Sequence, residues 1–190
     1  MLWLSIYGAV SGGGYNSSQG CEPYPLAPCS VDPTDPNDPL LPCHEPKPPP
    51  TLQCSAKCSN PAYNMSYSAD KHGANADFKP TGYSYRDDKQ VHAMKYLTEN
   101  GPLSATFTVM EDFPTYRSGI YKHVTGKALG GHAIMIVGYG TENGTDYWTV
   151  KNSWSQYWGD HGYFRIVRGV DEVGIESHMS GWIVQGDEEE

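Results

Sequence analysis

A histidine and an asparagine, His132 and Asn152, are the residues whose types and surroundings best fit catalytic chemistry. His132 follows two glycines and begins the apolar run 133–137, so its imidazole is expected at the edge of a core. An imidazole that serves as a general base or ion-pair partner must be held in one orientation, and an amide does this without adding charge. Trp154 and Trp158 would keep water away from such a hydrogen bond.

The pattern around His132 alone fits a structural histidine as well as a catalytic one. Asn152 is the residue that favours catalysis, because it supplies the orienting group. Four other histidines lie in polar, loop-like or helix-surface surroundings, where a solvated side chain is expected: His44, His72, His92 and His161.

One helix should precede the strands that carry these two residues. A helix is predicted over about residues 87–99, because Asp87 and Gln90 have the spacing of a capping box. Asn100-Gly101-Pro102 would end it. The apolar residues of its expected buried stripe are Val91, Met94 and Leu97.

Short strands should follow the helix. Strict alternation of apolar and polar residues predicts a half-buried strand over 103–109. Further strands are predicted at about 132–138, 146–151, 162–168 and 181–184. The sequence therefore predicts an α+β fold whose C-terminal half is an antiparallel, β-barrel-like lobe.

The first third of the chain is rich in proline and cysteine. Residues 23–50 hold 11 of the 15 prolines, so this stretch is expected to be an exposed, partly polyproline loop. All five cysteines lie at 21, 29, 43, 54 and 58, which favours disulfides, with Cys29 and Cys43 bracketing much of the loop. A zinc site at Cys54 and Cys58 is the alternative, although no second ligand pair follows at a suitable distance.

The composition limits the classes of partner. The chain has 22 acidic and 13 basic residues and no basic cluster, which argues against nucleic acid and anionic membranes. No apolar run has the length of a membrane span, and residues 1–10 are expected to be an interior segment rather than a secretory signal. Three glycosylation sequons, together with the cysteines, indicate a lysosomal, endosomal or extracellular location: Asn16, Asn64 and Asn143.

The motifs, taken together, resemble papain-family cysteine proteases of the cathepsin B-like kind. The C-terminal motifs are Gly130-Gly131-His132-Ala133, Gly138-Tyr139-Gly140, Tyr147-Trp148-x3-Asn152-Ser153-Trp154, Trp158-Gly159-x2-Gly162-Tyr163 and Gly174-Ile175-Glu176-Ser177. The cathepsin B-like features are Val10-Ser11-Gly12-Gly13, Gly20-Cys21-x-Pro23-Tyr24, the Cys29–Cys43 loop and Tyr67-x2-Asp70-Lys71-His72. This similarity covers nearly the whole chain, and it implies a papain-like fold.

The resemblance implies a role for each matching residue. His132 matches the imidazole that pairs with a cysteine thiolate and later protonates the leaving amine. Asn152 matches the residue that orients the imidazole, and Trp154 matches the indole that shields them. Gly131 lies where the family's substrate backbone passes. No cofactor or metal is implied.

The nucleophile that the resemblance requires is not found in this sequence. The family's cysteine lies in a Cys-Gly-[Ser/Ala]-Cys-[Trp/Tyr] stretch about 130–150 residues before the histidine. Counting back from His132 reaches residue 1 or earlier, and none of the five cysteines lies in such a stretch. We therefore expect a chain that lacks the nucleophile lobe and is inactive alone, with residues 1–78 the remnant of that lobe and 79–190 the C-terminal lobe.

Two departures from cathepsin B bear on specificity. Its bracketed loop carries two histidines that bind a substrate's C-terminal carboxylate, whereas residues 30–42 hold no histidine and three aspartates. Because anions repel a carboxylate, dipeptide-removing activity should be lost and endopeptidase geometry kept. His178 matches an acidic position of the pocket that accepts arginine, so a preference for arginine should be weaker.

The resemblance also implies disulfide partners and binding partners. It pairs Cys21 with Cys58 and Cys29 with Cys43, and leaves Cys54 for a cysteine of the absent lobe. The expected partners are protein or peptide substrates, the missing N-terminal lobe and a cystatin-like inhibitor. The alternative function is a catalytically dead fragment or decoy glycoprotein that binds peptides or partner chains.

Overall fold

The computed structural model of the 190-residue chain describes residues 8–31, 34, 36–43, 53, 55–71, 78–81 and 89–184. The chain forms two compact units. The first unit comprises residues 1–28, 44–80 and 183–190, and the second comprises 29–43 and 81–182. Among the residues that the structure describes, no helix has the length and apolar character needed to cross a bilayer.

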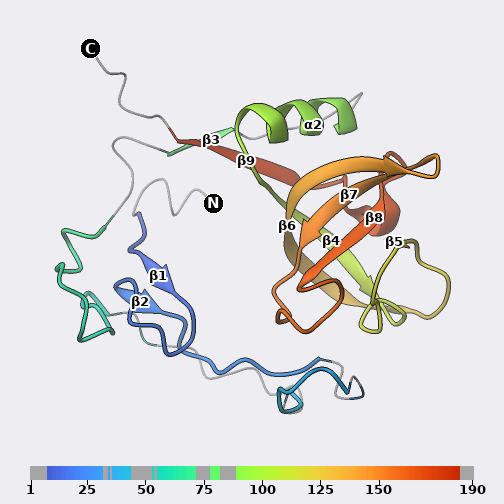
Figure 1. Cartoon of the computed structure of the whole chain (residues 1–190). Coiled ribbons are helices and arrows are strands. Elements are labelled where there is room, and N and C mark those ends of the chain that lie inside the picture. The colour runs from blue at the N-terminus through green and yellow to red at the C-terminus, as the bar shows by residue number, and fades with distance from the viewer. Residues whose placement is uncertain are drawn as a thin grey trace. The chain divides into compact units, whose positions relative to one another are not determined.

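A twisted sheet forms the frame of the second unit (Figure 1). Its strands lie in the order β9-β4-β6-β7-β8-β5, and every pair for which the register is resolved is antiparallel except β5 with β8. The strand bounds are β4 Leu103–Met110, β5 Ile120–Tyr121, β6 Ala128–Glu142, β7 Thr145–Lys151, β8 Tyr163–Val167 and β9 Met179–Val184. The predicted strands are confirmed; β5 was not predicted, because two residues give no alternation to detect.

Strand β4 shows why the sheet forms. Its residues alternate between buried and partly exposed along the whole strand, as the sequence pattern predicts. Its inward side chains meet a cluster of aromatic rings centred on Phe113, whose ring centroid lies 4.9 Å from those of Phe107 and Phe164 and 5.0 Å from that of Trp158. Each fully buried ring contributes roughly 1.5–3 kcal/mol of hydrophobic stabilisation, so this cluster is the core on which the site rests.

Helix α2, Lys89–Glu99, confirms the predicted helix but not its predicted buried face. Val91 is 54% exposed, whereas Ala93 and Tyr96 are buried. The face is rotated because the Tyr96 ring lies against Gly181, where a Cβ would come within 2.1 Å of it. Asp87, the other residue of the predicted capping box, lies outside the described residues. The Oε1 of Gln90 accepts a hydrogen bond from Arg168 at 3.0 Å.

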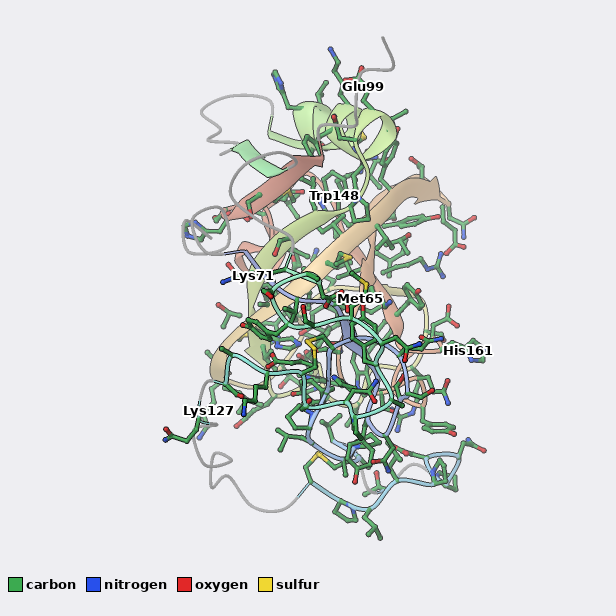
Figure 2. The ribbon with its side chains drawn as sticks, turned by 90° about the vertical axis from the view of Figure 1, so that its left-hand side faces the viewer. Met65, Lys71, Glu99, Lys127, Trp148 and His161 are labelled. Carbon is green, nitrogen blue, oxygen red and sulfur yellow. A yellow bond between two sulfur atoms is a disulfide. The ribbon has the colours of Figure 1, made fainter. Side chains whose placement is uncertain are left out.

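The periphery of the second unit is polar, and its interior is aromatic. Figure 2 shows the charged side chains of Glu99 and Lys127 at the edge of the unit, while Trp148 lies inside. Trp148 is fully buried, and its indole N–H donates to Oε1 of the buried Glu176 at 2.9 Å. A buried carboxylate is tolerated there because Gly169 and Asp171 also donate backbone hydrogen bonds to it.

The first unit is held mainly by covalent and polar links. Strands β1, Gly12–Gly13, and β2, Glu22–Pro23, pair in parallel. A short strand, β3, spans Phe78–Thr81. The buried Asp70 accepts hydrogen bonds from the backbone and hydroxyl of Ser11 and from the Tyr63 hydroxyl. These links compensate for a small apolar core.

Candidate active site

The structure brings His132 and Asn152 into direct contact. Nε2 of His132 lies 2.9 Å from Oδ1 of Asn152. An amide oxygen only accepts hydrogen bonds, so Nε2 carries the proton and donates. Oδ1 is itself oriented, because it accepts the backbone N–H of Ser153 at 2.8 Å. No described residue hydrogen-bonds to Nδ1, so that nitrogen remains available to another group.

Aromatic rings shield this hydrogen bond. The indole of Trp154 stacks on the imidazole, with ring centroids 5.0 Å apart and an interplanar angle of 27°. On another side, the Phe107 ring meets the imidazole edge to face at 5.9 Å. Asn152 is only 8% exposed. The pair therefore lies in an environment of low dielectric, where a hydrogen bond is electrostatically stronger than in water.

The strand register explains why two residues twenty positions apart meet. Strand β6 pairs with β4 so that His132 lies opposite Phe107, on the face of the sheet that packs on the aromatic core. Strand β7 lies on the other side of β6 and ends at Lys151, one residue before Asn152. The backbone N–H of Asn152 donates to the carbonyl of Gly162 at 2.9 Å, which fixes the start of the following loop.

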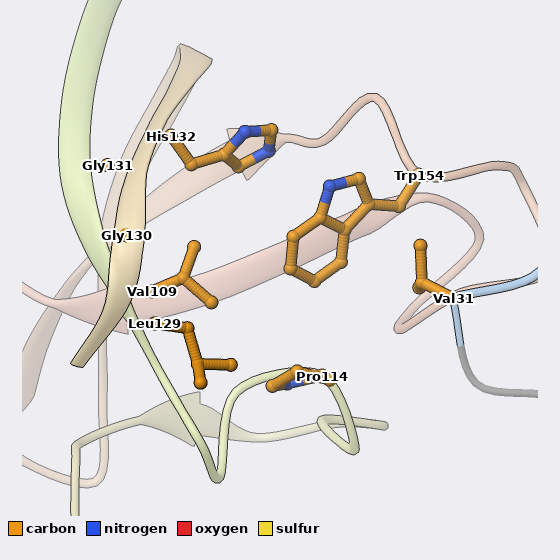
Figure 3. A pocket seen from close by; sticks show the side chains of 8 residues that line it. All are labelled: Val31, Val109, Pro114, Leu129, Gly130, Gly131, His132 and Trp154. Atoms are coloured by element: carbon orange, nitrogen blue, oxygen red, sulfur yellow. The ribbon is translucent and has the colours of Figure 1, made fainter. Parts of the chain in front are cut away.

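A hollow of about 330 Å³ opens beside the imidazole (Figure 3). It is lined by Val31, Val109, Pro114, Leu129, Gly130, Gly131, His132 and Trp154. A Cβ built on Gly131 would meet no atom within 4 Å, so the backbone there faces open space. The absence of a side chain leaves room for another peptide backbone to approach His132.

His178 does not line this hollow. It lies just before β9, and its carbonyl accepts the backbone N–H of Thr106 at 3.2 Å. Thr106 pairs with Ala133 on β6, one residue beyond His132, and all three of His178, Thr106 and Ala133 have exposed side chains. His178 is therefore one strand removed from β6, and the register places it on the opposite face of the sheet from His132.

The described cysteines form the two disulfides that the resemblance implies. Cys21 is bonded to Cys58, and Cys29 is bonded to Cys43. Cys58 is therefore not available as a zinc ligand, which argues against the alternative of a zinc site. Cys54 lies outside the described residues, as do His44 and His72. The three sequon asparagines, Asn16, Asn64 and Asn143, are exposed.

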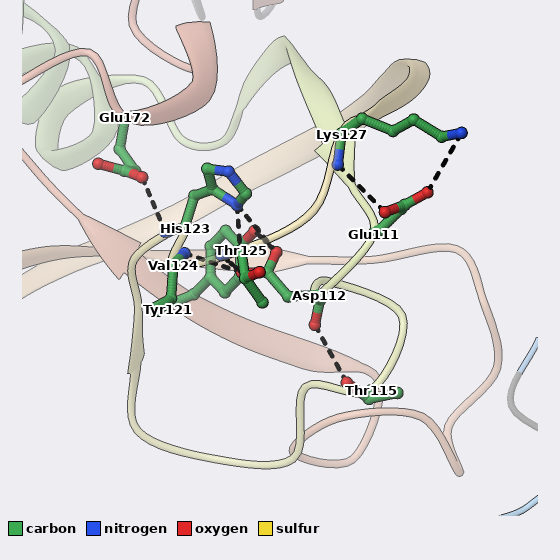
Figure 4. Close-up of polar contacts among 9 residues, drawn as sticks. All are labelled: Glu111, Asp112, Thr115, Tyr121, His123, Val124, Thr125, Lys127 and Glu172. Atoms are coloured by element: carbon green, nitrogen blue, oxygen red, sulfur yellow. Dashed lines mark hydrogen bonds and ion pairs between the residues drawn. The ribbon is translucent and has the colours of Figure 1, made fainter.

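A second polar cluster was missed by the sequence analysis (Figure 4). Asp112 accepts hydrogen bonds from the Tyr121 hydroxyl at 2.6 Å, from Nδ1 of His123 at 3.1 Å, and from the backbone N–H groups of Val124 and Thr125. Partial burial acts to raise the pKa of Asp112, but these hydrogen bonds outweigh it and hold the pKa well below the usual value. Burial and the neighbouring Asp112 raise the pKa of Tyr121.

This Asp112 cluster orients the loop that leads to the hollow. Glu172 accepts the backbone N–H of His123 at 2.9 Å, so the loop is also tied to the segment before β9. Pro114, which lines the hollow, follows Asp112 by two residues. No periodic signal marks the cluster, because its members lie in loops or, for Tyr121, in the two-residue strand β5.

Comparison with known proteins places these residues in a family. The papain family cysteine protease pattern matches residues 44–183. The curated protein "Cathepsin B-like cysteine proteinase 4" of Caenorhabditis elegans is 45% identical over 188 residues, which are 95% of this chain and 51% of that protein. A "Gut-specific cysteine proteinase" of the same organism is 46% identical over 178 residues, 93% of this chain and 48% of the relative. The chain spans about half the length of these curated relatives.

Solved structures show the same fold. The structure of "proCathepsin B S9 from Trypanosoma congolense" superposes with a TM-score of 0.54 at 34% identity, covering 72% of this chain and 43% of that one. Digestive procathepsin L 3 of Tenebrio molitor larval midgut superposes with a TM-score of 0.51 at 26% identity, covering 63% of this chain and 38% of that one. The fold is papain-like, and the chain belongs to the papain family of cysteine proteases.

Proposed function

We propose that this chain is part of a cysteine-type endopeptidase of the cathepsin B-like kind, in which His132 and Asn152 assist a cysteine thiolate. One observation carries the proposal: Nε2 of His132 is held by Oδ1 of Asn152 at 2.9 Å, which leaves Nδ1 for a thiol. The membership of the papain family supports the choice of sulfur as the nucleophile.

The chemistry that this geometry supports is acyl transfer. Nδ1 of His132 takes the proton of the thiol, and the thiolate attacks the carbonyl carbon of the scissile peptide bond. The C–N bond then breaks, Nδ1 returns its proton to the leaving amine, and a thioester to the cysteine remains. Water, deprotonated by the same nitrogen, attacks the thioester and releases the acid and the thiol.

The thiolate is proposed to lie outside the 190 residues. Cys21, Cys29, Cys43 and Cys58 are oxidised in disulfides and cannot supply it. In this proposal residues 1–78 belong to the lobe that carries the nucleophile, and residues 79–190 are the lobe that carries His132 and Asn152. Cys54 would pair with a cysteine of the nucleophile lobe.

Gly131 and His178 are the residues proposed to contact the substrate. The open space at Gly131 supports its role as the place where substrate backbone passes. His178 is exposed and neighbours Thr106, which pairs with Ala133, the residue after His132. A substrate side chain on the acyl side that reaches this face would meet His178, which would favour arginine less than a carboxylate does. The loop 30–42 has three aspartates and no histidine, which supports internal cleavage over release of C-terminal dipeptides.

The wider setting is proposed from the same features. Two disulfides and three exposed sequons support glycosylation and a lysosomal, endosomal or extracellular location. The partners would be protein substrates, the nucleophile lobe and a cystatin-like inhibitor. A second candidate is a non-catalytic peptide-binding glycoprotein, which is favoured by the disulfide bonding of all four described cysteines.

Peptide hydrolysis by the mature protein that contains these residues distinguishes the endopeptidase from the non-catalytic peptide-binding glycoprotein. Internally quenched peptides with amidated C-termini should be cleaved, and His132→Ala should slow cleavage by about 10²–10⁴-fold. His161→Ala is the matched control, because His161 is exposed and lies outside the hollow. Binding of the same peptides without any cleavage would favour the non-catalytic candidate instead.

A further inference from the structure

The first unit contains a cavity of its own, with a volume of about 660 Å³. All of its lining residues belong to residues 1–28 or 44–80, and none of them lines the hollow beside His132. Strand β1 and Cys58, which is bonded to Cys21, form part of its wall. The volume is in the range of small-molecule sites, so this cavity has room for a ligand of about the size of a disaccharide.

Two tyrosine rings give the cavity flat apolar surfaces. Tyr24 is 61% exposed, whereas Tyr67 is half-buried. The Tyr67 ring has a neighbour that restrains it, because Nζ of Lys71 lies 5.9 Å from its centroid. An exposed aromatic ring beside a cavity offers a face on which the C–H groups of a ligand can pack.

The polar lining of the cavity is balanced in charge. Glu22 and Lys57 both line it and are exposed, and neither has an ion-pair partner among the described residues. Gln53, Ser55 and Ser59 add one amide and two hydroxyl groups, which both donate and accept hydrogen bonds. This lining favours a neutral ligand that carries many hydroxyl and amide groups.

N-acetylglucosamine combines the two properties that the cavity requires. One face of its pyranose ring presents C–H groups, which pack on an aromatic ring such as that of Tyr24. Its hydroxyl and acetamide groups donate and accept hydrogen bonds, as the amide of Gln53 and the neighbouring serine hydroxyls do. The sugar is neutral, so it meets the two opposite charges without repulsion.

A source of this sugar lies at the rim of the cavity. Asn64 begins the sequon Asn64-Met65-Ser66, is exposed, and precedes Tyr67 by three residues. The carbonyl oxygen of Met65 lies 3.7 Å from Sγ of Cys58, so the backbone beside Asn64 contacts the wall of the cavity. Three residues span no more than roughly 10 Å, which places the first sugars of a glycan on Asn64 within reach of the lining.

We propose that this cavity is a docking site for the two N-acetylglucosamine residues at the base of an N-linked glycan on Asn64 of the same chain. The Tyr24 ring packs against a sugar ring, and the polar lining binds the hydroxyl and acetamide groups. The docked glycan covers Cys58 and so shields the Cys21–Cys58 disulfide. The inference rests on the proposed glycosylation and does not depend on peptidase activity.

An endoglycosidase that cleaves between the two core sugars tests the docking. The mature protein is produced in a secretory eukaryotic host, and glycan release at each sequon is followed over time by mass spectrometry. Tyr24→Ala should speed release at Asn64 about fivefold, because the ring that packs on the sugar is lost. Release at Asn143, in the exposed turn between β6 and β7, should not change.

Two further variants control for the side chain itself. Tyr24→Phe keeps the ring and should keep the slow release at Asn64. Tyr15→Ala is the matched control, because Tyr15 is 45% exposed and does not line the cavity. It should leave the release rate at Asn64 unchanged. Equal release at Asn64 with and without the Tyr24 ring would overturn the inference, as would an Asn64 that bears no glycan.

Titration of the protein made without glycosylation tests the chemistry of the cavity separately. The disaccharide chitobiose, followed through NMR signals of the Tyr24 ring, should bind about fivefold more weakly to Tyr24→Phe,Gln53→Ala than to the unaltered protein. Tighter binding of maltose, which lacks acetamide groups, or of the zwitterionic dipeptide Gly-Tyr would contradict the choice of ligand. Chitobiose binding without protection of the Asn64 glycan would refute Asn64 as its source. None of these measurements involves peptide hydrolysis, so the proposed function stands or fails separately.

Discussion

The indole of Trp154 lies 5.0 Å, centroid to centroid, from the imidazole of His132 and is inclined to it by 27°. The same imidazole donates its Nε2 proton to Asn152, which is 8% exposed. The indole therefore covers a hydrogen bond that fixes the tautomer, while Nδ1 has no hydrogen-bond partner among the described residues.

Trp154→Ala should slow hydrolysis by roughly ten- to hundredfold, because water would compete for the Asn152 oxygen and weaken a bond whose loss costs about 1–3 kcal/mol. The measurement is kcat/KM for a quenched peptide with the mature protein. Trp154→Phe keeps an aromatic cover and should retain most activity. Full activity in Trp154→Ala would show that the indole does not protect the pair.

Gly131→Ala should slow peptide hydrolysis without lowering the free energy of unfolding. A Cβ at this position meets no atom within 4 Å, so the free energy of unfolding should change by less than about 0.5 kcal/mol. The added methyl group would displace an approaching peptide backbone, and hydrolysis should fall by roughly hundredfold. Gly14→Ala, where a Cβ also has open space, is the control. Equal hydrolysis by both variants would place the substrate backbone elsewhere.

The Asp112 cluster should make stability depend on pH in a defined direction. The pKa of Asp112 is lower in the folded protein than in the unfolded chain, because its hydrogen bonds stabilise the carboxylate. Its contribution is therefore fully present above about pH 4 and is lost as the pH falls through the folded pKa, which lies below the unfolded one. Asp112→Asn should lower the free energy of unfolding at pH 6 by about 1.5–3 kcal/mol.

Glu111→Gln provides the comparison for that measurement. Glu111 pairs with Lys127 at 3.8 Å, and both side chains are well exposed, so this ion pair should contribute less than about 1 kcal/mol. Denaturant unfolding of both variants at pH 3 and pH 6 separates the two contributions. If Asp112→Asn lowers the free energy of unfolding as much at pH 3 as at pH 6, the ionised carboxylate of Asp112 does not stabilise the fold.

Arg168 should be poorly replaced by lysine. Its side chain is 7% exposed, lies 3.2 Å from Oδ2 of Asp146 and stacks over the rings of Trp148 and Tyr139. A lysine keeps the charge but lacks the planar group, so Arg168→Lys should cost about 1–3 kcal/mol of unfolding free energy. Lys95→Gln, in an exposed pair with Glu99, should cost no more than about 0.5 kcal/mol. If Arg168→Lys and Lys95→Gln lower the free energy of unfolding by similar amounts, stacking of the guanidinium group does not stabilise the fold.

The sequence was most informative where a regular pattern or a specific motif was present. The alternation of 103–109 predicted β4, and the motifs around His132 and Asn152 predicted two residues that the strand register does bring together. The buried face of α2 was predicted wrongly: Val91 of the apolar stripe is exposed, whereas Tyr96 is buried and packs against Gly181. That contact depends on tertiary packing.

Features that join irregular segments could not be predicted. Val31 reaches the hollow from the Cys29–Cys43 loop, far along the chain from the other lining residues. Asp112 accepts hydrogen bonds from residues 121–125, which lie 9 to 13 positions further along the chain, and neither spacing nor residue type marked His123 as its partner. In both cases the contact is long-range and aperiodic, so local sequence patterns do not encode it.

Mass-spectrometric mapping of a thiol-directed epoxide on the mature protein tests the central claim most directly. A thiolate paired with His132 should react once per molecule, at a cysteine other than the five in these 190 residues, and His132→Ala should abolish the reaction. Labelling at Cys54, or labelling that persists in His132→Ala, would contradict the claim that His132 and Asn152 activate a thiol supplied from outside this chain.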